Sequence, residues 1–118
     1  MATVIERADA ITHVTFMSAA DQSPPIGPTD VAKMVDAAAR PDPSGNPVED
    51  LDDPDRVWLP TYDLSAAVAA VFEAKASEVA NRFDAVIDRQ DLSRSQLYDH
   101  FTKQARFWRS KTFGTLSR

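Results

Sequence analysis

The sequence has no cysteine, only three glycines and only two histidines among its 118 residues. A chain without cysteine can form neither a disulfide framework nor a thiolate metal site. The histidines, His13 and His100, have no spacing typical of a metal site or a catalytic triad, and we expect His100 to be a surface or half-buried structural residue. Glycine-rich phosphate loops, serine elbows and H-E-x-x-H helices are also absent. The sequence therefore predicts a protein that is not an enzyme and needs no cofactor or metal.

Long apolar runs are missing as well. No stretch approaches the ~20 apolar residues that a membrane-spanning helix requires. The first ten residues, MATVIERADA, lack the apolar segment of a secretory signal. A length of 118 residues fits one domain with a single core. We expect a protein that is made in a bacterial cytoplasm and does not contact a membrane.

The charge is distributed unevenly along the chain. Residues 94–118 contain six basic side chains and one acidic one, whereas residues 1–93 contain seven basic and seventeen acidic ones. The chain is therefore an acidic body with a basic end, and such an asymmetry often marks a docking segment. The net charge of −5 argues against a free-standing DNA-binding protein, whose affinity depends on neutralising phosphates.

The most regular part of the sequence lies between residues 62 and 109. Apolar residues recur there at three- and four-residue spacing, which predicts an antiparallel pair of helices over about 63–84 and 93–109. Asp63 is the candidate N-cap of the first helix, and Ser93 or Ser95 begins the second. The predicted core of the pair consists of Leu64, Val68, Val71, Phe72, Val79, Phe83, Leu97, Phe101 and Trp108.

The first predicted helix is also rich in alanine. Alanine has the highest helix propensity, and its small side chain lets a neighbouring helix approach closely. This surface suits side-by-side packing of helices, within one chain or between chains. The alanines concerned are Ala66, Ala69, Ala70, Ala74, Ala76 and Ala80.

The first third of the chain is less regular. Residues 2–17 fit a helix or, because ITHVTFM is rich in β-branched residues, a strand; we expect a helix because no partner strand is evident. Thr29 is predicted to cap a short helix from Asp30 to about Ala39, which Pro41 ends. The predicted fold class is all-α, a small bundle of three to four helices.

Residues 40–60 predict a long loop within this bundle. They contain five prolines, and residues 42–55 carry six acidic side chains and no basic one. The acidic pairs at 49–50 and 52–53 offer oxygen ligands, but no glycine-pinned calcium loop surrounds them, so we interpret them as a solvated spacer. Val57, Trp58 and Leu59 are expected to re-enter the core.

The last nine residues, SKTFGTLSR, contain only two isolated apolar side chains. These offer too little burial to offset the ordering cost of about 1–2 kcal/mol per residue. We therefore divide the chain into a helical domain, 1–109, and an extended C-terminal docking tail, 110–118, which stays loose until a partner orders it.

Three short motifs in the second half of the chain resemble a known family. They are Tyr62-Asp63-Leu64 before the alanine-rich run and Lys75-Ala76, Arg82-Phe83-Asp84 with a turn at Asp88, and LSRSQ (92–96) leading to Arg106 and Arg109. In this order they resemble the head-to-tail connector proteins of long-tailed bacteriophages, also called adaptor or head-completion proteins. Connector turns often have glycine after the acidic residue, where this chain has Arg89.

The resemblance implies a structural virion protein. Such a connector forms a ring with copies of itself, twelvefold to match the portal, and lies between the portal protein and the stopper or head-closure protein. It extends the channel through which genomic DNA passes without specific binding. The acidic side chains of this chain would suit such a channel, because they repel DNA. The resemblance assigns portal binding to the C-terminal segment, here Arg109, Lys111, Thr112, Phe113, Leu116 and Arg118.

Phe107 lies about 80° away from the predicted core stripe, at about 100° per residue. It either packs under the acidic loop or contacts a neighbouring subunit.

A second resemblance predicts a different function. The segment LSRSQLYDHF is similar to the DNA-reading helix of tetracycline-repressor-like regulators. Against this helix-turn-helix alternative, the middle helix and the glycine turn are missing, and ASEVANRFDAVIDRQ stands in their place.

Overall fold

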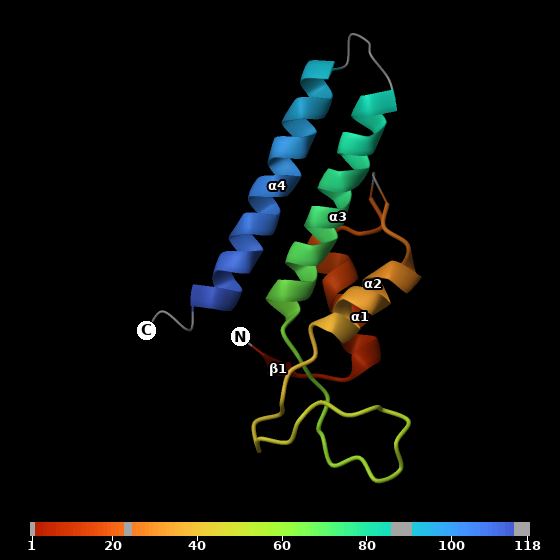
Figure 1. Ribbon diagram of the computed structural model, residues 1–118, viewed down its shortest axis with the longest axis vertical. Helices are drawn as coiled ribbons and strands as arrows, with labels where there is room; N and C mark the ends of the chain where they lie inside the picture. The colour runs from red at the N-terminus through yellow and green to blue at the C-terminus, as the bar shows by residue number, and fades with distance from the viewer. Residues whose placement is uncertain (1, 23–24, 86–90, 115–118) are drawn as a thin grey trace.

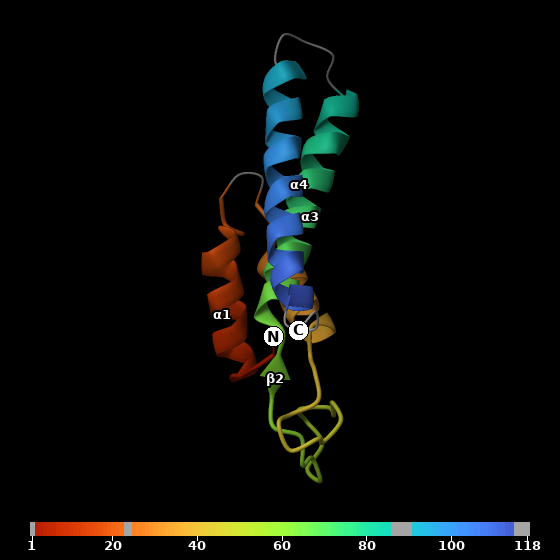
Figure 2. The same ribbon diagram turned by 90° about the vertical axis from the view of Figure 1, so that its left-hand side faces the viewer.

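The computed structural model describes the backbone of residues 2–22, 25–85 and 91–114, and the side chains of these residues except 81–95 and 112–114. The molecule is elongated, with extents of 57 × 34 × 19 Å. Two long antiparallel helices lie side by side, and two short helices pack near one end of the first (Figures 1 and 2). The predicted all-α class is confirmed. The described elements are β1 (Thr3–Val4), α1 (Arg7–Ser18), α2 (Pro28–Ala37), β2 (Thr61–Tyr62), α3 (Leu64–Ala85) and α4 (Asp91–Gly114).

The N-terminal helix is confirmed as α1, but the sequence did not predict the strand before it. β1 pairs antiparallel with β2, in the register Thr3 with Tyr62 and Val4 with Thr61. On the other side of β2, the Arg40 amide donates to the Thr61 carbonyl over 2.9 Å. The segment before α3 is therefore held on both sides by backbone hydrogen bonds.

The predicted start of α2 is wrong by two residues. The helix begins at Pro28, with Gly27 at the N-cap, and no side chain caps it. Proline suits this position because its φ is already helical and it has no amide hydrogen to satisfy. Thr29 therefore lies inside the first turn, and α2 ends at Ala37 rather than Ala39.

The start of α3 follows the prediction closely. The Ala66 amide donates to Oδ1 of Asp63 over 3.1 Å, which confirms Asp63 as the N-cap. The ends of α4 differ from the prediction, because this helix begins at Asp91 and continues to Gly114. The predicted tail boundary after Arg109 is therefore wrong by about one turn, and 110–114 are helical. Residues 115–118 lie outside the described residues.

The core has two parts. In the base, which comprises α1, α2, both strands and the N-terminal half of α3, the largest buried apolar side chains come from every element except β1. Between α3 and α4, Phe72 stacks on Phe101 with ring centroids 6.3 Å apart. Among the described elements, α4 packs extensively only against α3. The buried side chains include Val14, Val31, Val35, Trp58, Tyr62, Val68, Val71, Phe72, Val79, Phe101 and Ala105.

Most of the predicted core residues of the helix pair are buried. Leu64 and Trp108 are partly buried, and Phe83 lies outside the described side chains. Leu97 is the exception, because its side chain is 44% exposed. A helix covered by one neighbour buries only a narrow stripe, and the upper end of the pair stands clear of α1 and α2 (Figure 1).

Candidate interaction surfaces

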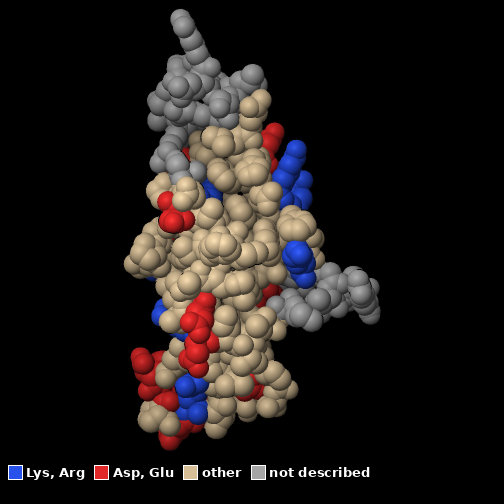
Figure 3. Space-filling view, turned by 180° about the vertical axis from the view of Figure 1, so that it is seen from behind, with Lys and Arg blue, Asp and Glu red and all other residues tan. Residues whose placement is uncertain are grey.

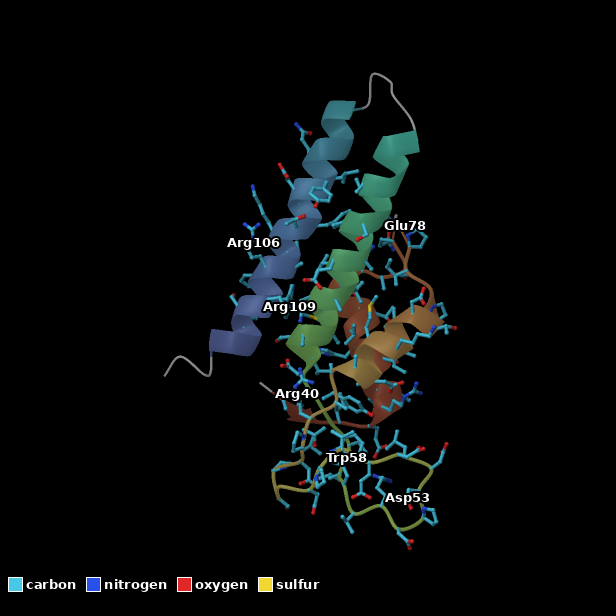
Figure 4. All side chains as sticks on the ribbon, viewed as in Figure 1. Arg40, Asp53, Trp58, Glu78, Arg106 and Arg109 are labelled. Atoms are coloured by element: carbon cyan, nitrogen blue, oxygen red, sulfur yellow. The ribbon has the colours of Figure 1, made fainter. Side chains whose placement is uncertain are left out.

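Residues 40–60 form the acidic loop, and hydrogen bonds join its two ends, 40–46 and 57–59, which we call its neck. Asp42, itself buried, accepts hydrogen bonds from the amide of Leu59 (3.0 Å) and from the amide and side chain of Asn46 (2.8 and 2.9 Å). The bond from Leu59, followed by those from Asn46, lowers the pKa of the Asp42 carboxyl. Nε1 of Trp58 also donates to the Arg40 carbonyl over 2.9 Å. The loop therefore leaves the base and returns to it through a closed neck (Figure 4).

The prediction for the end of the loop was right for one residue of three. Trp58 is buried and meets Tyr62 edge to face, with centroids 5.9 Å apart. Val57 and Leu59 are exposed, because alternate residues of an extended segment point to opposite sides. The neighbours of Trp58 in the chain therefore face solvent rather than the core.

Beyond the neck, most of the acidic side chains are exposed. Asp50 and Asp53 each accept a backbone hydrogen bond of 2.9 Å from the residue two positions further on, as in Asx-turns. The described residues contain no group of three or more histidine or acidic side chains that could hold a metal ion. Figure 3 shows the acidic side chains gathered at this end of the molecule.

Arg109 contacts its own subunit. Its guanidinium binds Glu73 of α3 through two hydrogen bonds, of 2.7 and 3.3 Å. This hydrogen-bonded pairing raises the pKa of Arg109. Both side chains remain about half exposed, and pairs of this kind typically contribute only 0–1 kcal/mol. Arg109 thus ties α4 to α3, in the position where the sequence predicted the start of a portal-binding segment (Figure 4).

Phe107 does not pack under the acidic loop. Its side chain is 51% exposed and stands edge-on to Trp108, with centroids 5.6 Å apart. Nζ of Lys111 lies 4.9 Å from the Phe107 ring centroid and 5.5 Å from that of Trp108, within cation–π range. We call Phe107, Trp108 and Lys111 the aromatic knob. The side chains of Thr112 and Phe113 lie outside the described side chains, and Leu116 and Arg118 lie outside the described residues.

An open hollow of about 520 Å³ lies between α2, α3 and the side chain of Arg109. Its floor includes a stripe of α3 alanines at four-residue spacing, together with apolar side chains of α2 and of the segment before it. Its rim is charged and includes residues of both signs. The floor residues are Ile26, Met34, Ala37, Ala66, Ala70 and Ala74, and the charged rim residues are Asp30, Lys33, Arg40 and Glu78.

Lys75 is a structural residue whose importance the sequence reasoning missed. It is 1% exposed, and its Nζ donates to the Gln22 carbonyl over 2.8 Å and lies 5.6 Å from the Phe101 ring centroid. Burial lowers its pKa, although Asp21 opposes this shift. Lys75 thus joins the segment after α1 to α3 beneath α4. Lys75 lies midway between Val71 and Val79, at the four-residue spacing of the buried face of α3. This spacing was the signal in the sequence that Lys75 would be buried.

The geometry of the second long helix bears on the helix-turn-helix alternative. In that motif the two helices cross at about 90–120° and the recognition helix presents a free face to the DNA groove. Here α4 lies nearly parallel to the axis of α3, and Phe101 of the candidate reading segment is buried against α3 (Figures 1 and 2). His100 of the same segment is exposed. This arrangement lends the DNA-binding alternative no support.

Comparisons with known proteins identify no relative. No family model, curated protein or solved structure matches the chain. Among the described helices, none is long and apolar enough to cross a membrane.

Proposed function

We propose that this protein is a structural subunit of a bacteriophage head-to-tail connector. In this proposal, copies of the chain form a twelvefold ring between the portal protein and the stopper protein, and the ring extends the DNA channel. The protein would be made in the bacterial cytoplasm and would reside in the virion.

The exposed C-terminal half of α4 carries this proposal. α4 packs extensively against α3 alone, so its outer face is left uncovered by the described residues. That face presents the half-exposed Phe107 with the ammonium group of Lys111 above its ring. The neighbouring Arg106 is exposed and lines the groove between α4 and α3. An exposed aromatic side chain with neighbouring cations is typical of a binding surface, because aromatic and arginine side chains are enriched at protein interfaces.

The motifs that resemble connectors have structural roles in this chain. Asp63 caps α3, Tyr62 belongs to the strand pair, and Lys75 joins α3 to the segment after α1. A similarity at such positions is consistent with a shared framework.

The acidic loop suits the DNA channel that the proposal requires. Its exposed carboxylates form a strongly negative end of the molecule, away from the basic side chains of α4 (Figure 3). A wall of the same sign as the phosphates disfavours binding and lets DNA pass.

The test is whether the purified protein adds to portal-containing heads that lack their connector. Two truncated chains, ending at Gly114 and at Arg109, both keep the Arg109–Glu73 pair and should stay folded. The chain ending at Gly114 should keep wild-type helix content, and the chain ending at Arg109 should lose only the helical signal of residues 110–114. We expect the chain ending at Arg109 to lose addition, because it lacks Lys111 and the last turn of α4. Comparison with the chain ending at Gly114 separates the helical turn from residues 115–118. Normal addition by both truncated chains would contradict the docking role of this segment.

A further inference from the structure

The aromatic knob and the open hollow lie on different sides of the same chain. Arg109 lines the hollow, and Phe107 precedes it by two residues. At about 100° per residue, these two side chains leave α4 about 200° apart. Phe107 therefore points away from the hollow of its own chain. The two surfaces are free to meet different neighbours.

The knob is held in one orientation before any contact is made. Trp108, partly buried, packs against the core, and Phe107 stands edge-on to it. Lys111 lies over both rings. A side chain already fixed in its bound orientation loses less conformational entropy on binding. Phe107 thus has the properties of an anchor residue, although 51% of its surface is exposed.

The hollow is large enough to admit this anchor, and part of its lining is apolar. An apolar cavity of about 150 Å³ is enough to hold a benzene ring, and the hollow measures about 520 Å³. Its alanine floor lets the backbone of a second helix approach closely. The hollow is lined by two carboxylates, Asp30 and Glu78, and by three basic side chains, Lys33, Arg40 and Arg109. The two carboxylates have no ion pair within the described part of the chain. Glu78 lies at the end of the hollow away from Arg40, and it is there that the cation accompanying Phe107 finds a partner (Figure 4).

We infer that the aromatic knob of one copy docks into the hollow of a second copy. Phe107 enters between α2 and α3 of the neighbour, with Lys111 directed toward Glu78 and away from Arg40, which lies at the other end of the hollow (Figure 4). Because knob and hollow are different surfaces, the contact is head-to-tail and can propagate into a ring. The inference rests on the proposed connector function for the ring that this contact would close.

The first test is self-association of the full chain, measured by sedimentation velocity without any portal. We expect concentration-dependent species larger than a dimer. Phe107→Asp removes the knob and Ala70→Gln fills the hollow without changing charge, and each should weaken association by about 30-fold or more, as for a central interface residue. Phe16→Asp is the matched control, because Phe16 is an 81% exposed aromatic side chain on α1. Ala8→Gln, at an exposed alanine of α1, is the control for the hollow.

Mixing the two defective chains makes the test specific. A Phe107→Asp chain keeps its hollow and an Ala70→Gln chain keeps its knob, so the mixture should form one intact contact and stop at a heterodimer. An interface elsewhere would give no such complementation. A wild-type chain that stays monomeric up to about 1 mM, or a Phe107→Asp chain that associates like wild type, would overturn the inference.

Charge and proximity can be tested at the rim. Lys111→Glu should weaken association, and Glu78→Lys in the same chain should restore it. Because the natural chain has no cysteine, Glu78→Cys chains mixed with Lys111→Cys chains should form a disulfide-linked heterodimer in preference to either homodimer. A heterodimer yield no greater than random pairing gives, which is twice that of either homodimer, would contradict the docking geometry. If these tests fail while the protein still adds to heads, only the knob contact is refuted; if they succeed without addition, the connector role is refuted.

Discussion

The base and α4 differ in how many neighbours hold them. The base packs helices and a strand pair around α3, and hydrogen bonds fix its linking segments. Asp42 accepts from Leu59 and Trp58 donates to Arg40 across the two ends of the acidic loop, and Lys75 donates to the segment after α1. α4 has one extensive neighbour, α3, and relies on the stripe of Phe101, Ala105 and Trp108. The comparison indicates that α4 is the part most open to rearrangement and to new contacts, because opening it exposes a single interface.

The largest expected effect comes from removing one aromatic side chain from each region. Phe101→Ala and Trp58→Ala should each reduce the free energy of unfolding by about 3–5 kcal/mol. Phe101→Ala should speed amide hydrogen exchange mainly in α4, whereas Trp58→Ala should speed it throughout the base and α3. Phe107→Ala is the control, because this side chain on the same helix is half exposed and its loss should cost about 0.5 kcal/mol or less. Uniform exchange in all variants would mean that the two regions open as one unit.

A second comparison separates the two contributions of Lys75, the burial of its apolar stem and the charge of its ammonium group. This side chain contacts both the base and α4. Lys75→Ala should destabilise more than Lys75→Met, by about 0.8 kcal/mol per buried methylene lost, because methionine keeps an apolar stem. The folded-state pKa of Lys75 is lowered by burial, so between that pKa and the ordinary value of about 10.4 the unfolded chain binds the extra proton. Stability from this group therefore rises with pH through that window.

Denaturant unfolding of wild type and Lys75→Met at a series of alkaline pH values measures this rise. The difference between the two proteins removes the contributions of other titrating groups. If the difference is constant with pH, the folded-state pKa of Lys75 is not lowered.

A smaller effect is expected at the neck of the acidic loop. Asp42→Asn replaces one carboxylate oxygen with an NH2 group, which cannot accept the hydrogen bond that the backbone N–H of Leu59 donates. The substitution should therefore lower the melting temperature at pH 7. The folded-state pKa of Asp42 is lowered, so its stabilisation is present above the unfolded value of about 3.9 and is lost as pH falls through the folded value. The gap between the two melting temperatures should therefore close in acid. Asp53→Asn, in an exposed turn, is the control and should lower the melting temperature at pH 7 less than Asp42→Asn does.

The smallest effect is expected for the exposed pair that joins α4 to α3. Arg109→Ala and Glu73→Ala should each cost about 0–1 kcal/mol, and the double variant should cost little more than either single one. The cost should diminish in 1 M salt, because salt screens exposed charges. A loss above about 2 kcal/mol would show that α4 depends on this pair more than on its apolar stripe.

The sequence predicts those features that local periodicity determines. α3, α4, the Asp63 cap and most of the α3 core followed from spacing and capping rules. The pattern of residues 2–17 fitted a helix or a strand, so α1 did not follow from spacing alone. The pairing of β1 with β2 could not be predicted, because it joins residues far apart in the chain and each strand has only two residues. Leu97 has the spacing of the apolar stripe of α4, but no described element besides α3 lies near enough to cover it.

The candidate site was predictable only in part. Phe107 was singled out by its angle from the apolar stripe, but its cation–π contact with Lys111 required α4 to continue beyond Arg109. The hollow could not be inferred, because it depends on how α2 lies against α3 and α4. Surfaces formed by several elements depend on tertiary packing, for which the sequence offers no local pattern.

The central claim is that α4 and the hollow meet other chains while the base holds the fold. Amide hydrogen exchange tests it most directly, measured on the free protein and on the same protein assembled onto portal-containing heads. We predict slower exchange in the C-terminal half of α4 and in the segments that line the hollow, with little change in α1. Protection confined to α1, or no protection in α4, would contradict the account.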